Sequence, residues 1–283
     1  MAGVSMKDIK LRIKSMESTK QITKAMEMVA ASKLRRAQER VTNSRPYFEI
    51  LFDTLNTIAN NTEDFSSPYL EQREVKKTCF VVIGGDRGLA GGYNHNVFKL
   101  AYSRMEGKDA CVVPIGKKCL EFFRARKAEI LTEAYAVAGD VHVGDCFTVA
   151  RLVSRGFLAG EFDAVCVVYT NFVSMLSQSP AVLDLLPLEY RPRPGDRPAE
   201  CLTLYEPDST AVYDAIIPEY LGGLIYGALC ESVTSEQGAR RTAMDAATKN
   251  AEEMISGLSL KYNRARQGAI TQEITEIVAG AEQ

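Results

Sequence analysis

Apolar residues in the first 41 positions recur at steps of mostly three or four, which is the spacing of one face of an α-helix. After Arg45-Pro46 the spacing resumes at Leu51, Leu55 and Ile58, and Asn60-Asn61 then signals an end. This pattern predicts an N-terminal helical segment over residues 1–60, kinked at Pro46 because proline removes a helix hydrogen bond. The apolar stripe comprises Ile9, Ile13, Met16, Ile22, Met26, Val29, Leu34, Ala37 and Val41.

The end of the chain carries a second helical pattern. No proline follows Pro218, so we predict an uninterrupted helix from there, within a helical segment over residues 211–283. Small and apolar residues in it step alternately by three and four, which is the heptad spacing of a coiled coil. Because small seam residues bury less area than leucine, we expect the pair to depend on its surroundings for part of its stability. The heptad comprises Met244, Ala247, Ala251, Met254, Leu258, Lys261, Ala265 and Gly268.

The two terminal segments differ in charge. Residues 1–45 hold 11 Lys/Arg against 4 Asp/Glu, whereas residues 219–283 hold 6 Lys/Arg against 9 Asp/Glu. Opposite charge favours association, so we expect the two segments to form a long antiparallel coiled coil. The surplus positive charge of the first helix is left for an acidic partner.

The middle of the chain, residues 75–210, has a different pattern. Short β-rich apolar runs alternate with helix-like stretches, which predicts a Rossmann-like, mostly parallel α/β domain. The proline-rich stretch from Pro180 to Pro198 is interpreted as extended surface chain. The predicted strands are Cys79–Ile83, Cys111–Ile115 and Ala164–Tyr169, with Ile130–Tyr135 and Cys201–Tyr205 as weaker candidates, and the predicted helices are Asn96–Met105, Lys117–Lys127 and Asp145–Ala159.

Composition narrows the class of protein. The chain has 283 residues and a net charge of −2, and no run of about 18 apolar residues is present to span a membrane. Charged residues interrupt the first apolar positions, so no signal peptide is expected. The seven cysteines contain no Cys-x-x-Cys pair, and we interpret them as small buried hydrophobes of a reducing, cytosolic compartment rather than as a metal site.

A glycine cluster over residues 84–92 follows a predicted strand and precedes a helix, where nucleotide-binding loops occur. It fits neither common phosphate-loop pattern in register, so we favour a tight strand-to-helix crossing in which Asp86 and Arg87 make local hydrogen bonds. A nucleotide-dependent enzyme remains the alternative. His95 and His142 lie near no nucleophile motif or metal-ligand spacing, and solvated or capping roles are expected for them.

The basic first helix could also bind nucleic acid through Lys20, Lys24, Lys33, Arg35 and Arg36. It lacks interleaved aromatic residues, and the sequence pI is about 5.9, which argues against a dedicated nucleic-acid binder. A helix enclosed by acidic protein surface explains the charge better.

Four blocks of the sequence resemble one family, the gamma subunit of bacterial F-type ATP synthase. The likeness covers essentially the whole chain, and the four blocks together are highly specific. They are Ile22–Leu34 near the N-terminus, Asp86–Asn94 in the glycine cluster, Ser235–Asn250 in the last helix, and Ile270–Ala281 at its end.

This resemblance implies a central rotor shaft without an active site, cofactor or metal of its own. The shaft would turn inside the alpha3-beta3 hexamer, and with the epsilon subunit its α/β domain would sit on the c-ring of Fo. Ion flow through the ring would then drive ATP synthesis by the beta subunits. The protein would be peripheral to the bacterial cell membrane on its cytoplasmic side, with no nucleic-acid partner.

The resemblance also implies individual contact residues. Contacts with the catalytic ring would come from Met26, Arg240, Arg266, Gln267, Thr271 and Glu273. A foot contact with epsilon or the c-ring would come from Tyr205, Glu206 and Asp208.

Overall fold

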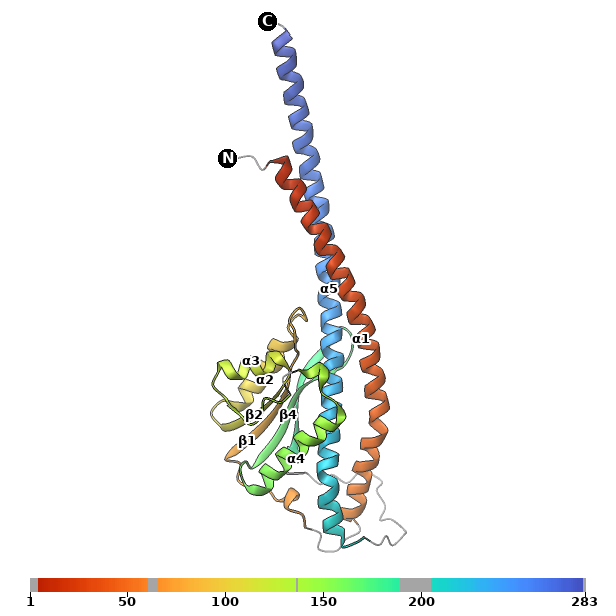
Figure 1. Ribbon diagram of the computed structural model, residues 1–283, viewed down its shortest axis with the longest axis vertical. Coiled ribbons are helices and arrows are strands. Elements are labelled where there is room, and N and C mark those ends of the chain that lie inside the picture. The colour runs from red at the N-terminus through yellow and green to blue at the C-terminus, as the bar shows by residue number, and fades with distance from the viewer. Residues whose placement is uncertain (1–4, 61–65, 136, 189–204, 282–283) are drawn as a thin grey trace. The chain divides into compact units, whose positions relative to one another are not determined.

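A computed structural model describes residues 5–60, 66–135, 137–188 and 205–281 (Figure 1). The chain forms two compact units, one from residues 1–31 and 240–283 and the other from residues 32–239. Two long helices, α1 (Met6–Asn60) and α5 (Ser209–Ala281), contribute to both units. The predicted pair of long terminal helices is therefore present, and α1 ends at the predicted Asn60.

Both long helices contain a proline. Pro46 lies inside α1, whose helix continues across it. The predicted start of the last helix at Pro218 is wrong, because α5 begins at Ser209. There the Asp208 carboxylate accepts a hydrogen bond from the Ala211 amide at 2.8 Å, which caps the first turn. The missing hydrogen bond of Pro218 is tolerated because its neighbours Ile217 and Leu221 are fully buried.

The α/β unit contains a five-stranded sheet with strand order β3-β2-β1-β4-β5. The first four strands run parallel in this order, so the predicted mostly parallel sheet is confirmed. β5 pairs antiparallel with β4 at one edge. The strands are β1 (Lys77–Ile83), β2 (Asp109–Ile115), β3 (Glu129–Ile130), β4 (Ala164–Phe172) and β5 (Gln178–Leu186).

Strand β5 corrects the interpretation of the first part of the proline-rich stretch as surface chain, and residues 189–198 of that stretch lie outside the described residues. It begins before Pro180, which pairs with Thr170 of β4. Proline cannot donate to a sheet but is accepted in an edge strand, which is the place of β5. Of the weaker candidate Ile130–Tyr135, only Ile130 is in a strand, because β3 is Glu129–Ile130. Most of the candidate Cys201–Tyr205 lies outside the described residues.

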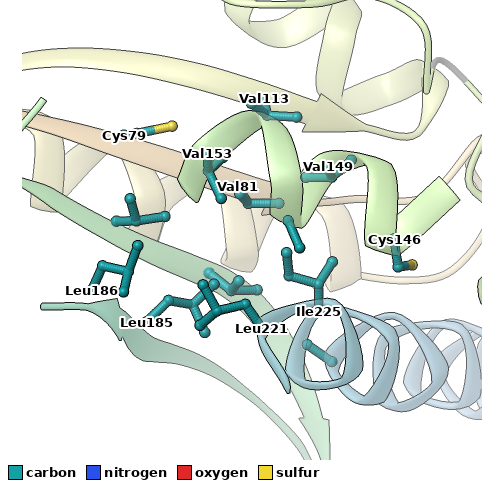
Figure 2. Close-up of a cluster of buried hydrophobic side chains, with 14 of the residues drawn as sticks. Cys79, Val81, Val113, Cys146, Val149, Val153, Leu185, Leu186, Leu221 and Ile225 are labelled. Atoms are coloured by element: carbon teal, nitrogen blue, oxygen red, sulfur yellow. The ribbon is translucent and has the colours of Figure 1, made fainter. Parts of the chain in front are cut away.

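Helices cover both faces of this sheet. On one face, α2 (Tyr93–Met105) and α3 (Lys117–Ala125) bury Phe98 and Phe123 against β1 and β2. On the other, α4 (Val143–Ala159) and α5 pack on the same strands, and Figure 2 shows Val149, Val153 and Ile225 converging there. The C-terminal end of α1 adds Leu55 and Ile58 to that second cluster.

One close backbone crossing holds the ends of β1 and β2 together. Gly116 has φ +100, and a Cβ built there would lie 2.3 Å from the Gly84 carbonyl oxygen. The Gly84 amide in turn donates to the Ile115 carbonyl at 2.9 Å. Glycine is needed at position 116 both for its dihedral angle and for the space.

We therefore predict that Gly116→Ala lowers the free energy of unfolding by at least about 2 kcal/mol, since the substitution adds backbone strain and an overlap. Chemical unfolding of the purified chain measures the change. Gly144→Ala is the matched control, because a Cβ there meets nothing within 4 Å and the residue lies in the first turn of α4. Equal stability of the two variants would contradict the crossing.

Candidate functional site

The two long helices contact each other in the coiled-coil unit through a polar pair. The hydroxyls of Thr23 and Thr248 lie 2.8 Å apart and are buried, and Lys20 forms an ion pair with Glu252 at 2.9 Å. A higher number on α1 thus pairs with a lower number on α5. This order shows that the two helices are antiparallel.

The buried stripe of α1 differs from the predicted one at two positions. Ile22 and Val29 are exposed, with 58% and 55% of their surface accessible, whereas Thr23 and Ala30 are buried. Hydrophobicity alone selected the wrong neighbour at each place, because the seam admits a hydrogen-bonded threonine and a small alanine. The partly or fully buried face follows Ile9, Ile13, Met16, Lys20, Thr23, Glu27, Ala30, Leu34, Ala37 and Val41.

The predicted heptad of α5 needs the same correction at alternate positions. Met244 and Ala251 are buried and Leu258 and Ala265 are partly buried, as predicted. Met254, Lys261 and Gly268 are exposed, and Ala247 is less buried than its neighbour Thr248. Moving each of these four positions on by one residue keeps the alternation and changes its order from three-then-four to four-then-three. The observed seam is Met244, Thr248, Ala251, Ile255, Leu258, Tyr262, Ala265 and Ala269.

Beyond this seam, all the side chains of α5 that the structure describes are exposed to solvent. Figure 1 shows α5 extending past the start of α1. The predicted ring contacts are all exposed: Arg266 and Gln267 beside the last seam positions, and Thr271 and Glu273 beyond them. Four large apolar side chains are exposed among them, with accessible fractions between 47% and 71%: Ile270, Ile274, Ile277 and Val278. Such a cluster is typical of a surface that another protein covers.

The other two predicted ring contacts are less accessible. Met26 on α1 and Arg240 on α5 are both partly buried. Ile22 and Val29, one turn from Met26 on either side, are 58% and 55% exposed, and Leu11 and Met28 are further exposed apolar residues of α1. Sequence reasoning placed Ile22 and Val29 in the seam and so missed this outward apolar face.

In the α/β unit, α5 is fixed to the carboxyl end of β4. The Thr170 amide donates to the Ser232 hydroxyl at 3.1 Å, and the Ser235 hydroxyl donates to the Thr170 carbonyl at 3.1 Å. The pairing of β1 with β4 stops at Val82 and Val168. Both serines therefore satisfy strand backbone groups beyond the end of the neighbouring strand.

The carboxyl end of β1 meets the same part of α5. Glu236 is buried, and a Cβ on Gly85 would lie 2.8 Å from its Oε1 atom. Burial raises the pKa of the neighbouring Tyr93 phenol, and the Glu236 charge raises it further. Open α/β sheets bind ligands at this place, where the strand order reverses between β1 and β4. Here side chains of α5 occupy it.

The glycine cluster forms the predicted crossing. The Asp86 carboxylate accepts hydrogen bonds from the amides of Lys117, Ala138 and Gly139 at 3.2, 2.7 and 3.0 Å. It thus ties the loop to the start of α3 and to a short 3-10 turn. Arg87 contributes its backbone carbonyl, which accepts from the Asn94 side chain. These contacts favour the structural interpretation of the loop over the nucleotide-binding alternative.

The predicted foot contacts and the two histidines lie in or beside the α/β unit. Tyr205 packs against the α/β core, Glu206 is exposed, and Asp208 caps α5. His142 is the N-cap residue of α4, as expected, and His95 is exposed.

The six cysteines in the described ranges are free and buried, in agreement with the interpretation as small hydrophobes. Burial raises the pKa of the Cys146 and Cys166 thiols to about 12. Within the described ranges, no three His, Cys, Asp or Glu side chains gather as a metal site would need. None of the helices described has an apolar stretch long enough to cross a bilayer.

Comparisons with known proteins agree on one family. The sequence matches the ATP synthase family profile over residues 5–283. It is 46% identical to the ATP synthase gamma chain of Ruminococcus albus, over 96% of each chain, and 46% identical to that of Alkaliphilus metalliredigens, over 99% of each. A chain of the Euglena gracilis mitochondrial ATP synthase, in a structure of OSCP, F1 and the c-ring, has the same fold, with a TM-score of 0.67, 19% identity, and coverage of 97% of this chain and 92% of that one.

The corrected seam makes a prediction about the coiled coil. Thr23→Cys combined with Thr248→Cys is expected to form a disulfide readily under mild oxidation, because the two hydroxyl oxygens already lie 2.8 Å apart. Ile22→Cys with Thr248→Cys is the control, and it should cross-link far more slowly because Ile22 faces outward. Gel mobility without reductant measures both yields. A faster reaction in the Ile22 pair would restore the seam predicted from sequence.

Proposed function

The chain belongs to the ATP synthase gamma-chain family, and we propose that it works in the central stalk of that complex as the rotor shaft. In this role α1 and α5 turn within the catalytic ring, and the α/β unit receives torque from an ion-driven c-ring. The observation that carries the proposal is the exposed end of α5, with its four large apolar side chains. Apolar side chains exposed to water are energetically unfavourable, and a ring of subunits that encloses this helix would bury them.

The shaft has to present different faces to the subunits around it. A rotor can shift the catalytic subunits between conformations only if each orientation interacts differently with those conformations. The exposed end of α5 is suited to this, because charged and apolar side chains share one unpaired helix there. Arg266, Gln267, Thr271 and Glu273, with Met26 and Arg240, are the proposed contacts with the alpha3-beta3 hexamer.

The positive charge of α1 supports the proposal that acidic protein surfaces surround this helix in the complex. Lys10, Arg12, Lys24, Lys33 and Arg36 are all exposed on α1. Oppositely charged surfaces attract at a distance and orient partners before contact. We expect acidic loops of the beta subunits to face this side of the shaft.

The chemistry of ATP synthesis is assigned to the partner subunits. The gamma chain itself would be a non-catalytic subunit, because α5 occupies the place where an α/β sheet of this order binds its ligands. The epsilon subunit and the c-ring are the proposed partners of the α/β unit, with Tyr205, Glu206 and Asp208 as foot contacts. The complex would lie on the cytoplasmic side of a bacterial membrane, with this chain peripheral to it.

Co-purification tests the assignment directly. A tagged copy expressed at native level should retain an ATPase ring and the c-ring through gentle purification, identified by mass spectrometry. Recovery of the tagged chain alone, at full yield and folded, would overturn the proposal.

The exposed end of α5 gives a sharper prediction. Ile277→Asp should leave the stability of the isolated chain unchanged, because Ile277 is 71% exposed. Within the assembled complex it places a charge in an apolar contact, so coupled ATP synthesis in vesicles should fall at least about ten-fold.

Leu176→Asp is the matched control for this experiment. Leu176 is 87% exposed on the turn between β4 and β5, so the same charge is added to an exposed apolar side chain elsewhere. Synthesis should stay near the wild-type rate in this variant. Equal losses in both variants would show that the end of α5 has no special contact with the ring.

A further inference from the structure

The buried stretch of α5 in the α/β unit consists of two chemically different parts. The first part is apolar and packs in the main core through Tyr213, Ile217, Leu221 and Ile225. The second part is polar although equally buried. It comprises Ser232, Thr234, Ser235, Glu236 and Gln237, each at most 8% exposed.

Apolar burial fixes the rotation of a helix less sharply than hydrogen bonds do. The hydrophobic effect is non-directional, so small rotations of a helix within an apolar core cost little. A turn by one residue, about 100°, would expose buried side chains such as Ile217 and Leu221 and is excluded by the core itself. Hydrogen bonds weaken steeply once the donor–hydrogen–acceptor angle falls below about 120°. The polar contacts therefore resist the smaller rotations of α5 that the apolar contacts tolerate.

The polar contacts of α5 involve both strands at the reversal point. Ser232 accepts a hydrogen bond from the backbone amide of Thr170, and Ser235 donates one to the backbone carbonyl of the same residue. The Glu236 carboxylate lies close to the backbone of Gly85. Any side chain at position 85 would displace this carboxylate, because a Cβ there would lie 2.8 Å from Oε1 of Glu236. The ends of β4 and β1 thereby define one rotational setting of α5.

A glycine one turn further along α5 restricts its position as well. A Cβ on Gly238 would lie 3.3 Å from the Phe172 ring, which is tight contact, and 3.6 Å from Nε2 of Gln178. Gln178 is itself held, because its side-chain amide donates to the carbonyls of Ser174 and Met175. The last residue of β4 and the first residue of β5 therefore leave little room for α5 to shift toward the sheet.

We propose that Ser232, Ser235 and Glu236, which we term the polar seat, lock α5 in rotation against the α/β unit and so transmit torque between that unit and the shaft. The inference rests on the proposed rotor function. It assigns the three residues a positioning role: they act by keeping α5 from turning when the α/β unit is driven.

The polar seat explains why polar residues are retained at fully buried positions. Each burial of a hydroxyl or carboxylate costs free energy unless its hydrogen bonds are made. Replacement by aliphatic residues would maintain a packed core but remove the directional contacts. Without these contacts, α5 would rotate relative to the α/β unit under load, and less torque would reach the shaft.

The test uses the complete ATP synthase carrying Ser232→Ala and Ser235→Ala together, reconstituted into vesicles. ATP hydrolysis and ATP-driven ion uptake are measured on the same vesicles. Ion uptake per ATP hydrolysed should fall at least about two-fold, because the two directional hydrogen bonds are gone. Ser235→Thr alone retains a hydroxyl and should keep the wild-type ratio.

Ser154→Ala is the matched control. Ser154 is 2% exposed and lies on α4 in the same unit, so its loss removes a buried hydroxyl without touching the polar seat. Its ratio should equal that of the wild type. Should the double variant fail to assemble, Ser232→Ala and Ser235→Ala are measured singly, since each removes one of the two bonds.

The outcomes separate the two claims. An unchanged ratio in the assembled double or single serine variants, or an equal fall in Ser154→Ala, overturns the polar seat while leaving the rotor function intact. Absence of ATP-driven ion uptake with the wild-type chain, in a complex that hydrolyses ATP, overturns the proposed function itself. A fall confined to the serine-to-alanine variants supports the proposal.

Discussion

The structure depends on the continuity of α5, a single helix of 73 residues that continues across Pro218. One stretch of this helix is buried in the α/β unit, the next is paired with α1, and the last is exposed. A helix of this length transmits force only while its backbone bonds are continuous, since each bond links residues four positions apart. Every function inferred for the chain requires that continuity, because the surfaces concerned lie on different stretches of α5.

The coiled-coil unit is only weakly stabilised by its own contacts. Its seam contains alanines and threonines, and its ion pair Lys20–Glu252 joins side chains 44% and 51% exposed. Exposed pairs of this kind contribute about 0–1 kcal/mol. Large apolar side chains are also found outside the seam, at Ile22 and Ile277 among others. A self-sufficient coiled coil would bury such side chains, so this distribution suits a shaft that other subunits enclose.

Sequence reasoning found the two helices and the parallel sheet because their patterns are long or strongly β-rich. It failed where one residue decides the answer. Thr23 and Thr248 were missed in the seam because a hydrogen-bonded polar pair has no hydrophobic signal. Strand β5 was missed because Pro180 signals a break, although an edge strand accepts proline. The burial of Glu236 depends on the approach of α5 to the sheet, which no local pattern shows.

Rotation of the α/β unit relative to the catalytic ring is the most direct measurement of the account. Lys108, exposed in the loop after α2, can be replaced by cysteine to carry a bead while the ring is held on a surface. The six described native cysteines are buried and should not compete for the label. We predict unidirectional, ATP-dependent rotation of the bead. A bead that stays still while the immobilised complex hydrolyses ATP at its normal rate would contradict the account.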